Sequence, residues 1–230
     1  GDSAVQDPGQ AWNALTVGAM TNLTEVSGSL YQGWSAVAPS GGIAPCSTTS
    51  INWDPKNWPI KPDLVVEGGN WAQSPNGSQA DAIDSLSLVS TSNKYPASPL
   101  SATGDTSASA AQLALMGANL KARYANLWPE TQRALLIQSA RWTEQLRQQF
   151  GNGTEKLLRH VGYGVPDLAR ASDSVGNAAV MVLQDQLFPF KLNDDPAKGI
   201  QLNQMCLFEL PWPVEALLEL RDADVTLRVT

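Results

Sequence analysis

The sequence is poor in histidine, cysteine and basic residues, and each shortage excludes a class of protein. It has one histidine and two cysteines, so it offers neither a Cys/His cluster with zinc spacing nor a dense disulfide framework. Lys and Arg total 15 against 22 Asp and Glu, which gives a formal net charge of −7. Because nucleic-acid-binding proteins need a basic surface, that class is excluded as well.

Long apolar runs and internal repeats are also missing from the chain. No stretch approaches the roughly 20 apolar residues that span a bilayer, so no membrane span is expected. No glycine-rich loop carries the lysine of a phosphate-binding cradle. Hydrophobic residues still make up 43% of the sequence, which is enough to build a core. The sequence therefore predicts a folded protein without a cofactor.

Three carboxylates are close enough in sequence to suggest a cation site. They are Glu67, Asp81 and Asp84. A calcium site needs six or more oxygen ligands gathered around one ion. Acidic side chains in a solvated loop account for these three residues without an ion, so no metal is predicted.

The hydrophobic pattern of the first two thirds predicts an α/β protein. Short strands are expected at 13–19, 63–67 and 84–90, and strand-like composition returns at 178–185. Helical spacing predicts a helix over 107–124, with Gly117 on its buried face where another backbone could approach closely. Further helices are expected at 129–140, 142–150 and 166–172.

The last forty residues have a different pattern. Strands are predicted at 205–209 and 225–229, separated by Pro211-Trp-Pro213 and a short helical piece. The final alternating run has no partner strand in view. We therefore expect 191–230 to be the start of a truncated β-rich domain, or to be completed by another chain.

The segment with the strongest chemical signal is Gly104-Asp-Thr-Ser107, which precedes the predicted helix. A serine at a helix N-terminus has an accessible hydroxyl, and its backbone N–H points with the helix dipole toward any anion formed there. That arrangement supplies half of an oxyanion hole for acyl transfer. Serine is also a preferred helix cap, and this segment by itself favours the capping role.

Five segments together change that interpretation. They occur in the order found in the second half of the catalytic domain of subtilisin-like serine peptidases (subtilases), which the chain resembles. The segments are 13–19 (NALTVGA), 61–69 (KPDLVVEGG), 104–107 (GDTS), 127–136 (LWPETQRALL) and 162–166 (GYGVP). The resemblance is greatest to a bacterial branch of large subtilases that has the Gly-Asp-Thr-Ser variant.

The resemblance implies a fold, a reaction and one catalytic residue. Residues 1–190 would be the C-terminal half of the catalytic domain, with part of a mostly parallel sheet flanked by helices. Ser107 would form the acyl-enzyme during peptide-bond hydrolysis, and its own N–H would be one oxyanion donor. The sequence departs from the family pattern in an inserted Asp105, and in Ser109 and Ala111, which replace an alanine and a proline.

The same resemblance places the other catalytic residues upstream of this sequence. In subtilases the aspartate and histidine precede the serine, whereas His160 follows Ser107 and is expected at a helix end. The family's oxyanion asparagine also lies upstream, and Asn70 is not in its position. The chain is therefore expected to be an inactive fragment of a serine endopeptidase, with a polypeptide as substrate and the upstream part of the same polypeptide as partner.

Two other interpretations remain open. The chain could be a non-catalytic pseudo-peptidase, or a tryptophan-rich module that binds polypeptide or carbohydrate. Its tryptophans could equally stabilise loops that have little regular structure; they are Trp12, Trp34, Trp53, Trp58, Trp71, Trp128, Trp142 and Trp212. A sheet cut in two would also predispose the fragment to form a homodimer.

Overall fold

The computed structural model describes residues 3–54, 56, 58–173, 180–209, 214–219 and 226–229. The chain divides into two compact units, Gly1–Val180 and Met181–Val229. The first unit has a mixed α/β architecture and contains all five segments named above. None of the helices in the described ranges is long and apolar enough to cross a membrane.

A three-stranded sheet lies at the centre of the first unit. Its strand order is β3-β1-β4, formed by β3 (Gly42–Ile43), β1 (Val17–Thr21) and β4 (Leu64–Glu67). β1 and β4 run parallel, with Val17 opposite Leu64, whereas β3 is antiparallel to β1. The two predicted strands are confirmed, although the first is shifted toward the C-terminus.

One face of this sheet is covered by three helices. They are α1 (Asp105–Arg123), α2 (Pro129–Ser139) and α5 (Leu168–Ser172). Leu64 and Val66 of β4 point into this layer because alternate residues of a strand face the same side. The helical members of this core include Leu113, Leu120, Leu135, Leu136 and Ile137.

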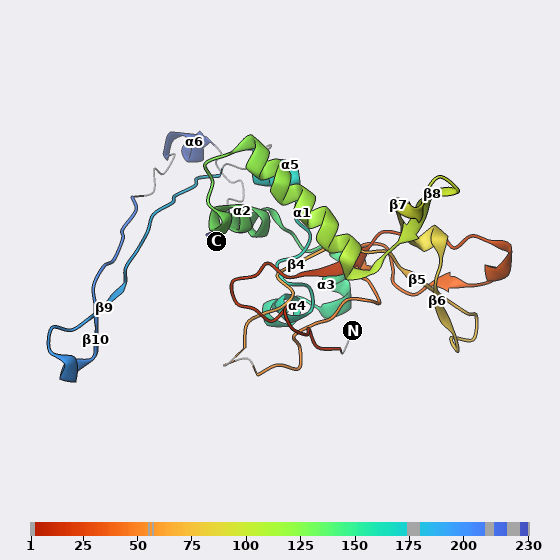
Figure 1. The fold of residues 1–230 in the computed structure, drawn as a ribbon, viewed down its shortest axis with the longest axis horizontal. Coiled ribbons are helices and arrows are strands. Elements are labelled where there is room, and N and C mark those ends of the chain that lie inside the picture. The colour runs from red at the N-terminus through yellow and green to blue at the C-terminus, as the bar shows by residue number, and fades with distance from the viewer. Residues whose placement is uncertain are drawn as a thin grey trace. The chain divides into compact units, whose positions relative to one another are not determined.

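The other face is covered by α3 (Glu144–Phe150) and α4 (Thr154–Val161). Val65, which lies between the two residues of β4 that face α1, points into this second core. Met20, Leu146, Leu157 and Val161 complete it. The sheet therefore separates α1 from α4, and Figure 1 shows these helices on opposite sides of β4.

Smaller β elements follow β1 and β4 along the chain. A second three-stranded sheet joins β2 (Ser35–Ala36), β5 (Trp71–Gln73) and β6 (Ala80–Ala82), and a hairpin joins β7 (Leu88–Lys94) to β8 (Ser98–Thr103). Short 3-10 helices lie at Ser29–Tyr31 and Asp84–Leu86. The strand predicted at 84–90 therefore begins only at Leu88.

The expectation of a mostly parallel sheet is not confirmed. Among the strand pairs that the structure describes, only β1 and β4 are parallel, and the other five pairs are antiparallel. Hairpins such as β7–β8 require antiparallel pairing, whereas parallel pairing requires a long crossover. The sequence pattern identified strands but carried no information about their direction.

The helix predictions are mostly confirmed, and one detail is wrong. α1, α2, α3 and α5 lie within a few residues of their predicted ranges, and His160 lies in the last turn of α4. Gly117 was expected to admit a neighbouring backbone. Instead, no described residue comes within 4 Å of a Cβ placed there, because this part of α1 packs against nothing at that position.

The second unit contains a short antiparallel hairpin and one short helix. β9 (Phe190–Leu192) pairs with β10 (Ile200–Leu202) around a 3-10 turn at Pro196–Lys198, and α6 spans Val214–Glu219. The strand prediction at 205–209 is wrong, because these residues have no regular structure. Strand-like composition alone does not make a strand without a partner.

Several predictions near the C-terminus fall partly outside the described ranges. Residues 178 and 179 of the predicted strand at 178–185 lie outside them, and 180–185 form no strand. Pro211-Trp-Pro213 and residue 225 also lie outside, and 226–229 have no regular structure. The division into domains 1–190 and 191–230 stays a prediction.

Candidate active site

Ser107 lies in the first turn of α1. The chain is extended at Gly104, with φ −157°, and the helix begins at Asp105, so Ser107 is its third residue. Ser107 is exposed, whereas Ala108 and Ser109 are buried. No hydrogen bond of the Ser107 hydroxyl is found within the described residues. The first N–H groups of a helix have no intrahelical acceptor, so this turn offers both a free hydroxyl and donors for an anion.

Two polar side chains attach this turn to the end of β4. The buried Ser109 Oγ donates to the carbonyl oxygens of Val66, at 3.0 Å, and Glu67, at 3.2 Å. Gln112 Nε2 donates to the Glu67 carbonyl at 2.6 Å. The sequence marked Ser109 only as a replacement for alanine, and gave no signal for Gln112. Together these two side chains hold the first turn of α1, which includes Ser107, against the end of β4.

Gly68 allows the close approach between β4 and α1. A Cβ at this position would lie 2.5 Å from Ala19 Cβ, 2.8 Å from Ser109 Oγ and 3.1 Å from the Asp105 carbonyl oxygen. Contacts below 3.0 Å between a Cβ and these atoms require a shift of the packed groups. The glycine of the predicted Gly-Gly turn is therefore required by packing beneath the Ser107 turn.

Two of the three carboxylates that suggested a cation site accept hydrogen bonds from other groups of the protein. Glu67 accepts from the backbone N–H of Asn22 at 2.6 Å and from that of Gly69 at 2.9 Å. Asp81 accepts from the Tyr31 hydroxyl at 3.3 Å. Within the described ranges, no group of three His, Cys, Asp or Glu side chains is placed to hold a metal ion.

His160 is not brought to Ser107. It lies on α4, on the opposite face of the central sheet from α1. Its Nδ1 is 2.7 Å from the Lys156 carbonyl oxygen, so this nitrogen carries the proton and donates it. Its ring also stacks on Phe150, with centroids 4.1 Å apart. The imidazole is buried and its position is explained by packing in the α3–α4 layer.

Asn70 has no amide proton left to offer an oxyanion. Its Nδ2 donates to the carbonyl oxygens of Leu23 and Ala38, both at 2.8 Å. Its Oδ1 accepts from the N–H groups of Ala38, at 3.1 Å, and Trp71, at 2.9 Å. This buried amide therefore joins three loops and acts as a structural residue.

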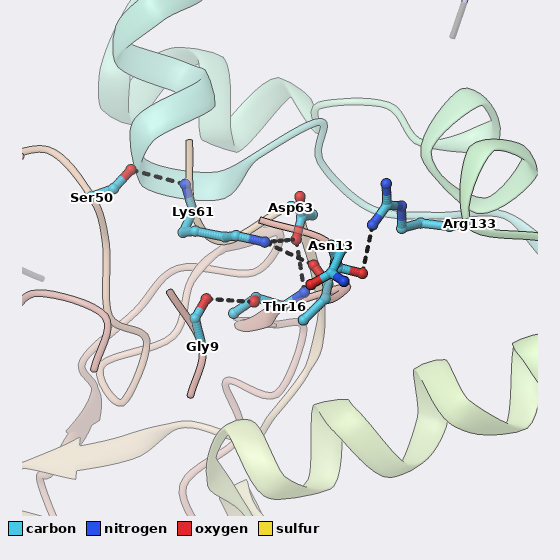
Figure 2. A network of polar contacts seen from close by, with 8 residues as sticks. Gly9, Asn13, Thr16, Ser50, Lys61, Asp63 and Arg133 are labelled. Carbon is cyan, nitrogen blue, oxygen red and sulfur yellow. Dashed lines mark hydrogen bonds and ion pairs between the residues drawn. The ribbon is translucent and has the colours of Figure 1, made fainter. Parts of the chain in front are cut away.

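An ion pair between a buried lysine and a half-buried aspartate lies just before β4. Lys61 Nζ lies 2.8 Å from Asp63 Oδ2 and donates to the Ala14 carbonyl, also at 2.8 Å. Asp63 Oδ2 accepts from the Thr16 N–H at 2.7 Å, just before β1 (Figure 2). Lys61 is only 1% exposed, so these partners replace the water that its ammonium would otherwise bind. The Lys-Pro-Asp segment thus fixes the entry of β4 against the entry of β1.

Three of the tryptophan contacts lie within loops and helix ends. The Trp34 ring meets Tyr31 edge-on at 5.2 Å, and the Trp53 and Trp58 rings are 5.8 Å apart. Trp142 Nε1 donates to the Gly162 carbonyl at 2.8 Å. These contacts are those of aromatic residues that stabilise irregular segments.

Comparison with protein-family models matches residues 1–164 to the subtilase family. No curated protein matches the chain. The matched range covers more than half of the 230 residues and includes the central sheet, α1 to α4 and the Gly104–Ser107 turn. It lies wholly within the first structural unit.

Proposed function

The chain belongs to the subtilase family of serine peptidases, and on this premise we propose that Ser107 is the nucleophile of a subtilisin-like endopeptidase. One observation carries the proposal. Ser107 is an exposed serine in the first turn of a helix whose N-terminal end is anchored to the sheet by Ser109 and Gln112. A nucleophile needs both features, because it must be accessible and must keep its position while the substrate binds.

The proposed reaction is peptide-bond hydrolysis through an acyl-enzyme. Ser107 Oγ attacks the scissile carbonyl carbon while a base removes the hydroxyl proton, and the carbonyl oxygen becomes an oxyanion. The Ser107 N–H, in the first turn of α1, donates to that oxyanion. The amine leaves with a proton from the protonated base, and water then hydrolyses the ester to regenerate the hydroxyl.

The base and its orienting carboxylate are proposed to come from outside residues 1–230. The sequence has one histidine, and His160 is buried across the sheet from Ser107 with Nδ1 bonded to Lys156. Asn70, the asparagine nearest the glycine turn, has its amide fully used. Residues 1–190 would then be the C-terminal half of the catalytic domain, and the chain alone would be inactive. Loss of a single oxyanion donor costs about 3 kcal/mol of transition-state stabilisation, and loss of the base costs more.

The test is peptide hydrolysis by the full-length polypeptide that contains residues 1–230. Ser107→Ala should lower kcat/KM by about 10⁶-fold, because the covalent pathway is lost. Two controls should keep the wild-type rate: Ser101→Ala, which removes an exposed serine from β8, and His160→Gln. Hydrolysis that survives Ser107→Ala would overturn the assignment. A full-length polypeptide without any hydrolytic activity would instead favour the pseudo-peptidase.

The isolated chain gives a second test. A fluorophosphonate reacts quickly only with an activated serine, so residues 1–230 alone should show no rapid labelling at neutral pH. Stoichiometric labelling of the isolated chain would contradict the proposal that the base lies elsewhere.

A further inference from the structure

The side chain of Glu67 links the two parallel strands of the central sheet where they end. Glu67 is the last residue of β4, and its carboxylate accepts from the backbone N–H of Asn22, at 2.6 Å, and from that of Gly69, at 2.9 Å. Asn22 directly follows β1, and Gly69 lies two residues beyond Glu67. The two bonds use different oxygens, Oε2 and Oε1. The carboxylate therefore ties the end of β1 to the glycine segment that follows β4.

The backbone of Glu67 holds the helix that carries Ser107. Its carbonyl oxygen accepts from Ser109 Oγ, at 3.2 Å, and from Gln112 Nε2, at 2.6 Å. Gln112 Nε2 also donates to the Ala108 carbonyl oxygen within α1, at 3.2 Å, so one amide group bonds to both the helix and the strand. Two side chains of α1 thus converge on a single carbonyl group of β4.

The glycines after Glu67 lie against the chain that precedes Ser107. A Cβ at Gly104 would lie 3.4 Å from the Gly68 carbonyl oxygen, and a Cβ at Gly69 would lie 3.9 Å from Gly104 Cα. Gly69 has a φ of 85°, a left-handed conformation that glycine adopts without strain. The segment 67–69 therefore contacts the chain on both sides of Ser107, before it at Gly104 and after it through α1.

We propose that Glu67 is a positioning residue for Ser107, because its carboxylate fixes the segment 67–69 on which the nucleophile turn rests. This inference rests on the proposed function of Ser107. Hydrogen bonds from backbone N–H groups to a carboxylate are charge-assisted and stronger than those to a neutral acceptor. Without the carboxylate, the Asn22 and Gly69 N–H groups lose this partner and the segment is free to shift. A misplacement of about 1 Å can lower the rate of a reaction by about 100-fold.

Amide hydrogen exchange tests the two carboxylate bonds independently of peptidase activity. The full-length polypeptide is used in a Ser107→Ala background, and exchange at residues 22 and 69 is read by mass spectrometry. Glu67→Ala should accelerate exchange at both positions by about 10- to 100-fold, which corresponds to the loss of a hydrogen bond to a charged group. Glu25→Ala, which removes an exposed carboxylate nearby in sequence, should leave both rates unchanged. Unchanged exchange in Glu67→Ala would overturn the contact.

Kinetics of the full-length polypeptide test the positioning role. Glu67→Ala should lower kcat by about 10- to 100-fold with little change in KM, because the substrate still binds while Ser107 is misplaced. Glu67→Gln keeps the size of the side chain, but its amide has one acceptor oxygen for two N–H groups, so kcat should fall in this variant as well. Glu25→Ala should keep the wild-type kcat.

A second control separates positioning from a general loss of stability. Ser139 is the buried last residue of α2, and its hydroxyl donates to the Leu136 carbonyl oxygen at 2.8 Å and accepts from the Asp167 N–H at 3.1 Å. Ser139→Ala should lower the midpoint of denaturant unfolding, as Glu67→Ala does, yet retain the wild-type kcat under conditions where both variants are folded. Equal losses of kcat in the two variants would overturn the positioning role.

These experiments distinguish failure of the inference from failure of the proposed function. Wild-type kcat in Glu67→Ala would overturn the positioning role while Ser107→Ala stays inactive. Activity in Ser107→Ala would overturn the function itself, and would leave the exchange result at residues 22 and 69 unaffected.

Discussion

The residues that precede β4 and those that follow it have different roles. Just before β4, Lys61 and Asp63 form an ion pair. Each charged group also hydrogen-bonds to the backbone near the start of β1. At its end, Gly68 leaves room for the first turn of α1, where Ser107 is exposed and its hydroxyl bonds to no described residue. Both ends belong to segments of the subtilase pattern, yet only the second leaves a reactive group available.

The difference shows how residues that stabilise the fold can be distinguished from residues that react, even when both lie in segments of the same family pattern. Lys61 is charged and resembles a functional residue in sequence, but its side chain is only 1% exposed and its ammonium donates to Ala14 and Asp63. Ser107 resembles a helix cap in sequence, but it accepts no cap hydrogen bond in α1. The environment of the polar group decides between the two roles, and substitutions at each end should therefore have opposite consequences.

The largest effect on stability is expected at the start of β4. Lys61→Met removes the partner of a mostly buried carboxylate and should cost about 3–5 kcal/mol in the free energy of unfolding. Urea denaturation monitored by circular dichroism measures it. Lys94→Met, at an exposed position of β7, is the matched control and should change stability by less than about 0.5 kcal/mol. Equal losses in the two variants would break the distinction drawn for Lys61.

A smaller loss is expected beneath the nucleophile turn. Gly68→Ala places a methyl group within 3 Å of Ala19 Cβ and Ser109 Oγ, and should cost about 1–3 kcal/mol through overpacking. Gly117→Ala, in the middle of α1 with open space around it, should instead stabilise the protein by about 0.5–1 kcal/mol. Thermal unfolding of the two variants measures both changes, and the melting temperature should fall in Gly68→Ala and rise in Gly117→Ala. A neutral Gly68→Ala would mean that α1 does not pack closely on β4.

Two serines on the same helix sharpen the comparison further. Ser109→Ala removes buried hydrogen bonds to Val66 and Glu67 and should cost about 1 kcal/mol. Ser107→Ala should leave stability unchanged, because no described hydrogen bond involves the Ser107 hydroxyl. Denaturant titration of both variants, beside activity of the full-length polypeptide, separates the effects. A destabilised Ser107→Ala would return Ser107 to the capping role.

The effect that is absent at neutral pH is a pH dependence centred on Cys46. Its folded-state pKa is raised to about 12 from a usual value near 9, mainly by burial and then by Asp105. The unfolded thiol therefore ionises first as pH rises, so stability from this group is complete below pH 9 and declines between pH 9 and 12. Unfolding free energies measured from pH 8 to 11 should fall more steeply in the wild type than in Cys46→Ser. Parallel curves would show that the thiol is not shielded.

Many of the helices and strands could be predicted, because their residue patterns are local in the sequence. An apolar run bounded by Pro62 and Gly68 placed β4, helical spacing placed α1, and the first-turn signal of Pro129 placed α2, each to within a few residues. Strand direction could not be predicted, because hydrophobic pattern does not encode the partner's orientation. The strand predicted at 205–209 was wrong for a related reason, because strand-like composition does not supply a partner strand.

The candidate site could be predicted only in part. The resemblance of 104–107 to a nucleophile turn singled out Ser107, but the contacts that hold the turn join residues far apart in sequence. The side chains of Ser109 and Gln112 hydrogen-bond to β4 residues that lie 43 and 45 positions earlier in the sequence. No local pattern connects such positions. Tertiary packing defines them, and only the structure brings them together.

The most direct test of the central claim is identification of the residue that reacts with a fluorophosphonate in the full-length polypeptide. Peptide mapping by mass spectrometry should place a single phosphonyl adduct on Ser107. Ser107→Ala should abolish labelling, and the midpoint of its denaturant unfolding should equal that of the wild type. An adduct on another serine, or undiminished labelling of Ser107→Ala, would contradict the assignment of Ser107 as the nucleophile.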